Sequence, residues 1–260
     1  MPKLSVTIIT RDEAADIAAV LASVAWADEV LVVDSESTDD TVAIARSHGA
    51  RVLVRPWPGY IEQKNFAAAS ASHDWILSVD ADERVTPALA SEIKALLGAT
   101  EPPARAYRVP RVTWHLGRWV RSTDWYPDWQ LRLYDRRVAS WTGRYVHESV
   151  KAEGPVARLS GELQHYAYRD IADHLETIDR YTTLAARQMD EQGRRASLLD
   201  VVFHAPFAFL RNYLLRGGIG DGLAGFLISA FNAHYVFLKF AKLWERQHQV
   251  ARPEATGQRD

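Results

Sequence analysis

The chain has 260 residues, of which 47% are hydrophobic and 25% are charged, a composition typical of a globular protein rather than a disordered one. It contains no cysteine, which excludes a disulfide scaffold, cysteine-ligated zinc or iron–sulfur sites and thiol catalysis. Basic and acidic side chains nearly balance at 31 against 33, but residues 1–100 carry 8 basic against 15 acidic ones, and this acidic half argues against nucleic acid as a partner.

The first hundred residues alternate strand-like and helix-like patterns. Apolar runs predict strands at 4–9, 29–33, 52–54 and 75–79. Helical spacing and capping residues predict helices at 14–24, from Ser37 or Thr38 to Gly49, at 61–71, and from Thr86-Pro87 to Gly98. Apolar strands that alternate with helices are typical of a parallel sheet with helices on both faces, so the fold class is α/β.

The pattern changes after residue 100. Pro102 and Pro103 interrupt it, and five of the nine tryptophans fall between residues 114 and 141, among arginines. After His165 the chain has helical periodicity, and residues 198–244 are apolar and aromatic with a break at Gly217-Gly218. We therefore divide the chain into residues 1–100, 101–165 and 166–260.

Carboxylates follow three of the predicted strands. Glu13 comes after the first strand, Asp34 ends the second, and Asp80 and Asp82 follow the fourth. The carboxyl ends of parallel strands form one edge of a sheet, where ligands bind. Like charges gathered there repel one another, and a divalent metal shared with substrate phosphates relieves that repulsion. Polar residues that merely cap the strand ends remain the alternative.

These residues, taken in order, resemble a known family. The segments that carry the likeness are Val6–Thr10 with Glu13, Val32–Thr41, Val79–Glu83, Trp57–Asn65, Trp125–Leu133, Val146–Glu148 and Tyr181–Ala185. Together they resemble the family 2 glycosyltransferases of the GT-A fold, and within these the bacterial lipopolysaccharide-core β-1,4-glucosyltransferase subgroup. The likeness covers residues 4–246. Asp12 is one departure, since many relatives have Asn there.

The resemblance implies a mixed, mainly parallel sheet with a helical C-terminal extension, and transfer of a hexose from a nucleotide diphosphate sugar with inversion. Residues 1–100 would be the nucleotide-sugar-binding half of the GT-A domain and residues 101–165 the acceptor-binding, catalytic half. The donor would be a UDP-hexose, UDP-glucose in the first place, and the cofactor Mg²⁺ or Mn²⁺. The residues assigned to nucleotide-sugar binding are Thr10, Glu13, Asp34, Lys64 and Asp80, and those assigned to the metal are Asp80, Asp82 and His147.

An inverting displacement needs a base that takes the proton of the acceptor hydroxyl. The resemblance assigns this role to Asp128, with Glu148 as the second candidate. Trp125, Arg121 and Arg132 are the residues expected at the acceptor, because aromatic faces stack on sugars and arginines bind phosphates. Several of the tryptophans can equally be core residues.

The C-terminal helices mix aromatic with basic residues, which favours a helix lying on the surface of an anionic membrane over a spanning one. The expected place of action is the cytoplasmic face of the inner membrane, with a glycolipid or saccharide acceptor such as the lipopolysaccharide inner core. A buried helix, or one packed in a homo-oligomer, is the alternative. Transfer to a capsule or exopolysaccharide, and a catalytically silent sugar-nucleotide-binding scaffold at the membrane, are the rival functions.

Overall fold

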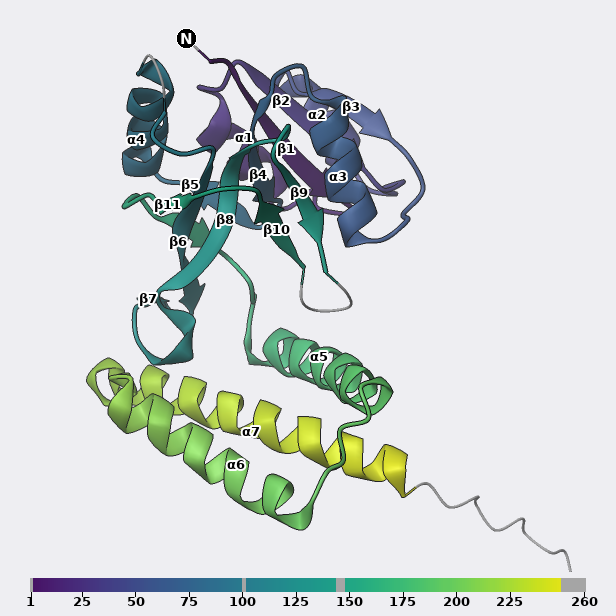
Figure 1. Cartoon of the computed structure of the whole chain (residues 1–260), viewed down its shortest axis with the longest axis vertical. Coiled ribbons are helices and arrows are strands. Elements are labelled where there is room, and N and C mark those ends of the chain that lie inside the picture. Colours follow the sequence, from purple (N-terminus) through teal and green to yellow (C-terminus); the bar gives the residue numbers. More distant parts are fainter. Residues whose placement is uncertain (1, 100–101, 144–147, 249–260) are drawn as a thin grey trace, which may run out of the picture. The chain divides into compact units, whose positions relative to one another are not determined.

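The computed structural model describes residues 2–99, 102–143 and 148–248 (Figure 1). The chain divides into two compact units, Met1–Asp170 and Ile171–Asp260. The change of pattern at residue 100 falls inside the first unit, where strands from both sides of it share one sheet.

The first hundred residues contain the four predicted strands and the four predicted helices, together with a strand at Glu83–Val85 that was not predicted. They are β1 (Leu4–Thr10), α1 (Ile17–Val24), β2 (Glu29–Asp34), α2 (Thr41–Ser47), β3 (Arg51–Val54), α3 (Tyr60–Ser70), β4 (Trp75–Asp80), β5 (Glu83–Val85) and α4 (Pro87–Gly98). The start of α4 is as expected, since the Thr86 side chain accepts a hydrogen bond from the Leu89 N–H. The predicted start of α2 was wrong. Ser37 donates its hydroxyl proton to Asp34 and does not cap the helix, which begins only at Thr41.

The rest of the first unit is mostly strand. Its elements are β6 (Ala106–His115), β7 (Arg118–Val120), the 3-10 turn η1 (Thr123–Trp125), β8 (Asp128–Asp135), β9 (Ala139–Thr142), β10 (Ser149–Ala152), β11 (Val156–Arg158) and β12 (Leu163–His165). Strands β9 and β10 form a separate antiparallel ribbon, and the others join the main sheet.

The main sheet has the order β3-β2-β1-β4-β8-β6-β12-β5, with β7 and β11 paired to β6. Strands β3, β2, β1 and β4 run parallel, and β8 is antiparallel to both its neighbours, so the expected mixed sheet is confirmed. The register places Thr10 opposite Asp34, and Ile9 opposite Asp80. The carboxyl ends of β1, β2 and β4 therefore meet at one edge.

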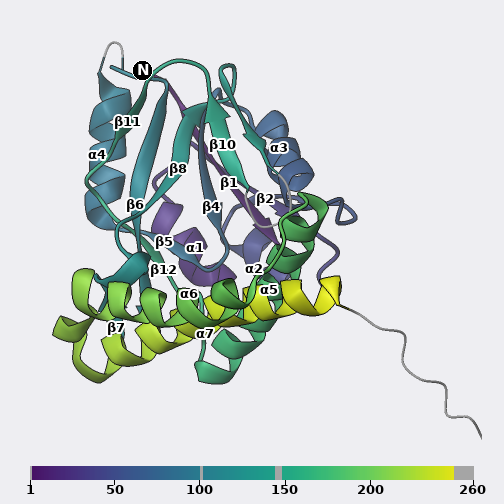
Figure 2. The same cartoon turned by 60° about the horizontal axis from the view of Figure 1, so that its bottom comes forward.

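Alternating side chains of the strands supply two cores, one on each face of the sheet. Helices α4 and α3 lie on opposite sides of the strands (Figure 2). On one face, Val6, Ile8 and Leu77 pack with the buried sides of α1 and α4. On the other, Leu31 and Ile76 pack with α3 and the β9–β10 ribbon. The ribbon and α3 thus share a core, which fixes both beside the strand edge.

The second unit is helical and contains α5 (Ile171–Glu191), α6 (Leu198–Leu210), the π-helical turn η2 (Arg211–Leu215), the 3-10 turn η3 (Gly218–Asp221) and α7 (Gly222–Gln247). A capping box between Ser197 and Asp200 starts α6. The predicted break at Gly217-Gly218 is confirmed. A Cβ on Gly225 would lie 1.8 Å from the Gly218 carbonyl oxygen, so only glycine permits this close turn between α6 and α7.

Candidate active site

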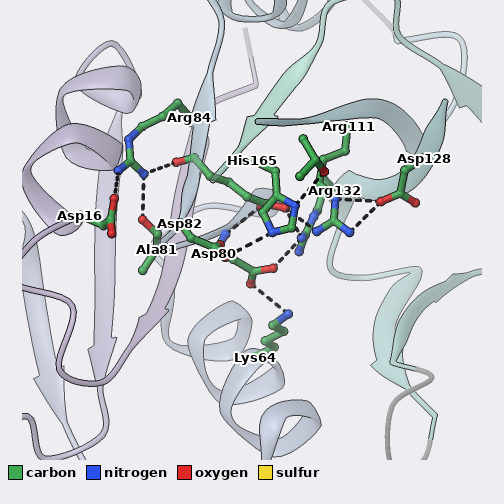
Figure 3. A network of polar contacts seen from close by, with 12 residues as sticks. Asp16, Lys64, Asp80, Ala81, Asp82, Arg84, Arg111, Asp128, Arg132 and His165 are labelled. Carbon is green, nitrogen blue, oxygen red and sulfur yellow. Dashed lines mark hydrogen bonds and ion pairs between the residues drawn. The ribbon is translucent and has the colours of Figure 1, made fainter. Parts of the chain in front are cut away.

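The site begins with Asp80, the last residue of β4. One carboxylate oxygen lies 3.0 Å from Lys64 Nζ, which α3 supplies, and the other lies 2.6 Å from Arg132 Nη2 on β8 (Figure 3). Burial alone would raise the pKa of Asp80, but the two cations hold it well below its usual range. Asp80 is therefore an anion held between two fixed cations at the sheet edge.

Arg132 lies deeper than we expected from its assignment to the acceptor. It is 2% exposed, and its Nη2 also lies 2.6 Å from Glu83 Oε1. Its Cζ is 5.7 Å from the centre of the Trp141 ring, and Lys64 Nζ lies 4.2 Å from the same ring. Arg132 thus belongs to the buried cluster around Asp80 rather than to an exposed acceptor surface.

Glu83, which belongs to the Val79–Glu83 motif but was given no role, and Arg111, which the sequence did not single out, extend this cluster to the predicted base. Glu83 is fully buried, accepts the Asp80 backbone N–H at 2.9 Å, and pairs with Arg111 Nη1 at 3.0 Å. Arg111 in turn donates from Nε and Nη2 to Asp128 Oδ2 at 2.8 and 2.7 Å, and Gln130 donates to Asp128 Oδ1 at 2.7 Å. A chain of paired charges therefore joins β4 to Asp128 (Figure 3).

Asp82 has a partner of its own. Its Oδ2 is 3.2 Å from His165 Nε2, at the end of β12, and this contact lowers the pKa of Asp82 although burial would raise it. Sequence analysis missed His165 because β12 reaches the site only through its pairing with β5 and β6. Within the described residues, no three His, Asp or Glu side chains gather closely enough to hold a metal by themselves.

The three other residues predicted at the nucleotide occupy the same edge. Asp34 is fully buried and accepts the Ser37 N–H at 2.9 Å. Burial, together with nearby Asp82, raises the pKa of Glu13 to about 7. Thr10, whose hydroxyl is buried, ends β1 beside them.

Asp12, the departure from the family pattern, has φ 54° and accepts the Thr38 N–H at 2.7 Å. Asn and Asp are the non-glycine residues that tolerate this left-handed conformation best, and the side-chain oxygen that makes this contact is present in both. The structure therefore accommodates the exchange at this position.

Unpaired polar atoms mark the same region. In the described part of the first unit, the buried side-chain atoms without a hydrogen-bond partner are Thr10 Oγ1, Gln63 Oε1, and Arg132 Nε and Nη1. Gln63 is fully buried and donates to Ser35 Oγ at 3.0 Å, next to Asp34. Leaving buried polar groups unpaired is costly, and such groups gather where a ligand completes them.

Glu148, the second base candidate, lies 3.8 Å from Lys64 Nζ, and its side chain is 17% exposed. Burial raises its pKa, and Lys64 opposes that rise. His147, the predicted third metal residue, lies outside the described residues. Asp128, Glu148, Lys64, Asp80 and Arg132 thus belong to one connected group of charges.

The two other predicted acceptor residues lie at the β6–β7 end of this unit. Arg121 pairs with Glu162 through both terminal nitrogens, and Trp125 packs between His115 and Tyr168, with ring centres 5.6 Å from each. Two other aromatic residues, Trp114 and Tyr166, are more exposed than Trp125.

Trp114 and Tyr166 are 36% and 40% exposed, and both pack edge-on against Trp119. The Tyr166 N–H donates to the Asp82 carbonyl at 2.9 Å. This aromatic ladder, made of Trp114, Trp119 and Tyr166, therefore begins beside Asp82.

Comparison with known protein families identifies the class of enzyme to which the chain belongs. The family model described as Glycosyl transferase family 2 matches residues 5–150, which include both Asp80 and Asp82. The chain is a family 2 glycosyltransferase. This glycosyltransferase is 34% identical over 266 residues to the lipopolysaccharide core biosynthesis glycosyltransferase LpsC of Rhizobium meliloti, covering 97% of each chain. It is also 34% identical to an uncharacterized glycosyltransferase of Rickettsia felis, covering 99% of this chain and 96% of the other.

Among solved structures, the mannosyltransferase PcManGT from Pyrobaculum calidifontis, in complex with GDP-Man and Mn²⁺, matches 95% of this chain and 88% of its own, with a TM-score of 0.55 and 16% identity. At that identity the likeness bears on the fold alone. It confirms the expected GT-A fold with C-terminal helices.

Proposed function

We propose that this glycosyltransferase moves a hexose, glucose in the first place, from a UDP-sugar to a saccharide of the lipopolysaccharide inner core or a related glycolipid, with inversion. The observation that carries the proposal is the group Lys64–Asp80–Arg132 at the carboxyl ends of the parallel strands, with Asp82 and His165 next to it. The name and lipopolysaccharide role of LpsC, a relative over nearly the whole length, support the acceptor class.

We further propose that Mg²⁺ or Mn²⁺ binds together with the nucleotide sugar. The side chains at Asp82 are suitable ligands for such an ion. A carboxylate and an imidazole nitrogen 3.2 Å apart are ligands that Mn²⁺ accepts. Because the described protein groups are too few to enclose an ion, the remaining ligands would be diphosphate oxygens and water. A bound ion would stabilise the negative charge that develops on the leaving diphosphate.

The protein itself supplies fixed positive charge for the same purpose. Lys64 and Arg132 are held by carboxylates and by the Trp141 ring, so they need no reorganisation when charge develops on the donor. The buried Nε and Nη1 of Arg132 and the buried Thr10 hydroxyl have no hydrogen-bond partner among the described residues, which supports a ligand at this edge that completes them. Asp34 and Glu13 would line the nucleoside part of the pocket.

We assign the base to Asp128. Arg111 and Gln130 hold both of its oxygens, which fixes the carboxylate in one orientation, and its side chain is still 32% exposed to an incoming acceptor. Glu148 remains the second candidate because burial raises its pKa, which makes a carboxylate a better base.

The two candidates have different neighbours, and kinetics separates them. Glu148 lies beside Lys64, so Glu148→Gln should alter the donor KM as well as turnover. Asp128→Asn should lower kcat by about 10²–10⁴-fold, as expected on loss of a base, while donor affinity stays within a few fold. Normal turnover of Asp128→Asn would move the assignment to Glu148.

For the acceptor, we propose that the aromatic ladder binds sugar rings, since exposed indole and phenol faces stack on saccharides and this ladder starts at Asp82. Trp119→Ala should raise the acceptor KM with little change in the donor KM. Trp125→Ala is the comparison, because that ring packs on His115 and Tyr168.

The proposal is tested by calorimetric titration of UDP, GDP and ADP, each with and without Mn²⁺, into the wild type and Asp82→Asn. We expect binding of UDP that depends on the ion and is lost in the variant. Asp74→Asn is the matched control, because Asp74 lies outside the site and pairs with Arg136 and Arg137 at 3.3 and 3.1 Å. Ion-independent binding, or equal binding by Asp82→Asn, would contradict the metal assignment, and preference for GDP would replace the UDP assignment.

A further inference from the structure

The helical unit exposes an apolar face of unusual extent. On α6 and η2 the exposed side chains recur at helical spacing, namely Leu199, Val202, Phe203, Phe207, Leu210 and Leu214. Phe203 is 63% exposed, and Leu215 and Leu223 at the turn are 80% and 74% exposed. A soluble protein rarely leaves so many large apolar side chains in contact with water unless something covers them.

An open apolar groove runs beside this face, between α6 and α7. Its volume is about 470 Å³, and its lining includes Ala205, Pro206, Ala230, Ala233 and Phe237. Small residues on both helices leave a mainly apolar channel, in which His234 is the polar lining residue among those described. Such a groove suits a hydrocarbon chain rather than a polar ligand.

The charge pattern of the same segment indicates what covers it. From the start of α6 to the end of α7, residues 198–247 contain three acids, which are Asp200, Asp221 and Glu245, and five bases, which are Arg211, Arg216, Lys239, Lys242 and Arg246. Apolar side chains combined with an excess of basic ones complement the surface of an anionic bilayer.

The contacts of α7 argue against a spanning hairpin. By length and composition two segments are apolar enough to cross a membrane, Leu198–Leu215 and Gly218–Gln247. However, one side of α7 packs on α5, and Lys242 Nζ binds the Asp179 carboxylate at 2.7 Å and the hydroxyls of Thr182 and Thr183. Helix α5 carries acids and bases along its exposed side, so it belongs in water and keeps its side of α7 there.

We infer that α6, η2 and the start of α7 form a one-leaflet membrane anchor, which inserts its apolar face into an anionic phospholipid surface and takes an acyl chain into the α6–α7 groove. Membrane binding itself does not depend on the proposed function. Only the purpose of the anchor, which is to bring the enzyme to a lipid-linked acceptor, rests on that function.

Vesicle co-sedimentation of the full chain tests the inference. We expect binding to phosphatidylcholine vesicles containing 30% phosphatidylglycerol, with weaker binding to phosphatidylcholine alone and at high salt. Burying one large apolar side chain contributes about tenfold in partitioning, so Phe203→Glu with Leu215→Glu should lower binding by about 100-fold or more. Leu175→Glu is the matched control, because Leu175 is an exposed leucine on α5, 40% exposed, outside the apolar face.

Two results would overturn the inference. One is that the wild type binds neither vesicle, and the other is that the double variant binds as well as the wild type. The face would instead be a contact between two copies of the chain if the wild type binds no vesicles and light scattering shows a dimer. In that case the double variant, but not Leu175→Glu, should be monomeric. Because the substituted side chains are exposed, the variants should fold, and far-UV circular dichroism checks this. Ion-dependent UDP binding, measured in the same samples, reports separately on the proposed function.

Discussion

The buried carboxylate of Glu83 gives the strongest prediction, because three groups depend on it. It accepts the Asp80 N–H and pairs with Arg132 and Arg111, each at 3.0 Å or less. In Glu83→Gln the volume is kept, but one negative charge is lost from a buried group in which carboxylates and cations are paired. Removing one partner of a buried ion pair costs about 3–5 kcal/mol, and we expect a loss of stability in that range.

Denaturant unfolding measures the stability, and transfer kinetics measure the consequence for the site. Since Arg111 positions Asp128 and the Glu83 oxygen positions the Asp80 backbone, kcat/KM should fall at least about tenfold even at temperatures where Glu83→Gln is fully folded. Glu153→Gln, at an exposed position, should change the unfolding free energy by less than about 0.5 kcal/mol. A loss below 1 kcal/mol together with unchanged kinetics would refute the idea that Glu83 holds this group together.

Three further predictions follow from other contacts. Lys64→Met keeps an apolar side chain over the Trp141 ring but removes a cation from the donor site, so the rate of transfer in a steady-state assay should fall by about 10²–10³-fold. Lys94→Met is the control, because Lys94 also lies over a tryptophan ring, and this change should leave the rate unaltered. Burial would raise the pKa of Glu29, but its hydrogen bonds lower it from 4.5 to about 2. The ionised carboxylate therefore stabilises the fold above pH 4.5, and this stabilisation is lost as the pH falls toward 2, so Glu29→Gln should flatten the acid side of the stability–pH curve. Gly161→Ala places a Cβ 2.4 Å from Leu89 Cα and should destabilise the protein by about 1–3 kcal/mol in thermal unfolding; an unchanged melting temperature would contradict this packing.

The grouping of polar residues at the carboxyl ends of the strands could be predicted from the sequence, because it depends on local patterns. Apolar runs identify β1, β2 and β4, and parallel pairing then brings Thr10, Asp34 and Asp80 together whatever the rest of the chain does. Lys64 could be placed only through the family resemblance, since its side chain reaches Asp80 through the packing of α3 on the sheet.

The partners of this edge could not be predicted, because they come from strands whose place in the sheet is not a local property. Strand β8 inserts antiparallel between β4 and β6, and this places Arg132 against Asp80 in the buried cluster. Helical or strand periodicity of residues 101–165 carries no information about that order. Likewise His165 reaches Asp82 only because β12 joins β5 and β6.

The balance of positive and negative charge in the site affects how the site binds a diphosphate. Lys64 and Arg132 already face Asp80, and Arg111 faces Glu83 and Asp128, so the cations of the group are largely compensated by carboxylates. The positive charge that Lys64 and Arg132 offer a diphosphate at this edge is therefore reduced by their carboxylate partners. The Asp82 carboxylate would repel it further, and burial together with the Asp82 charge already raises the pKa of Glu13 to about 7. These electrostatics support our proposal that a divalent ion at Asp82 and His165 accompanies the donor, because such an ion turns the acidic edge from a barrier into a binding site.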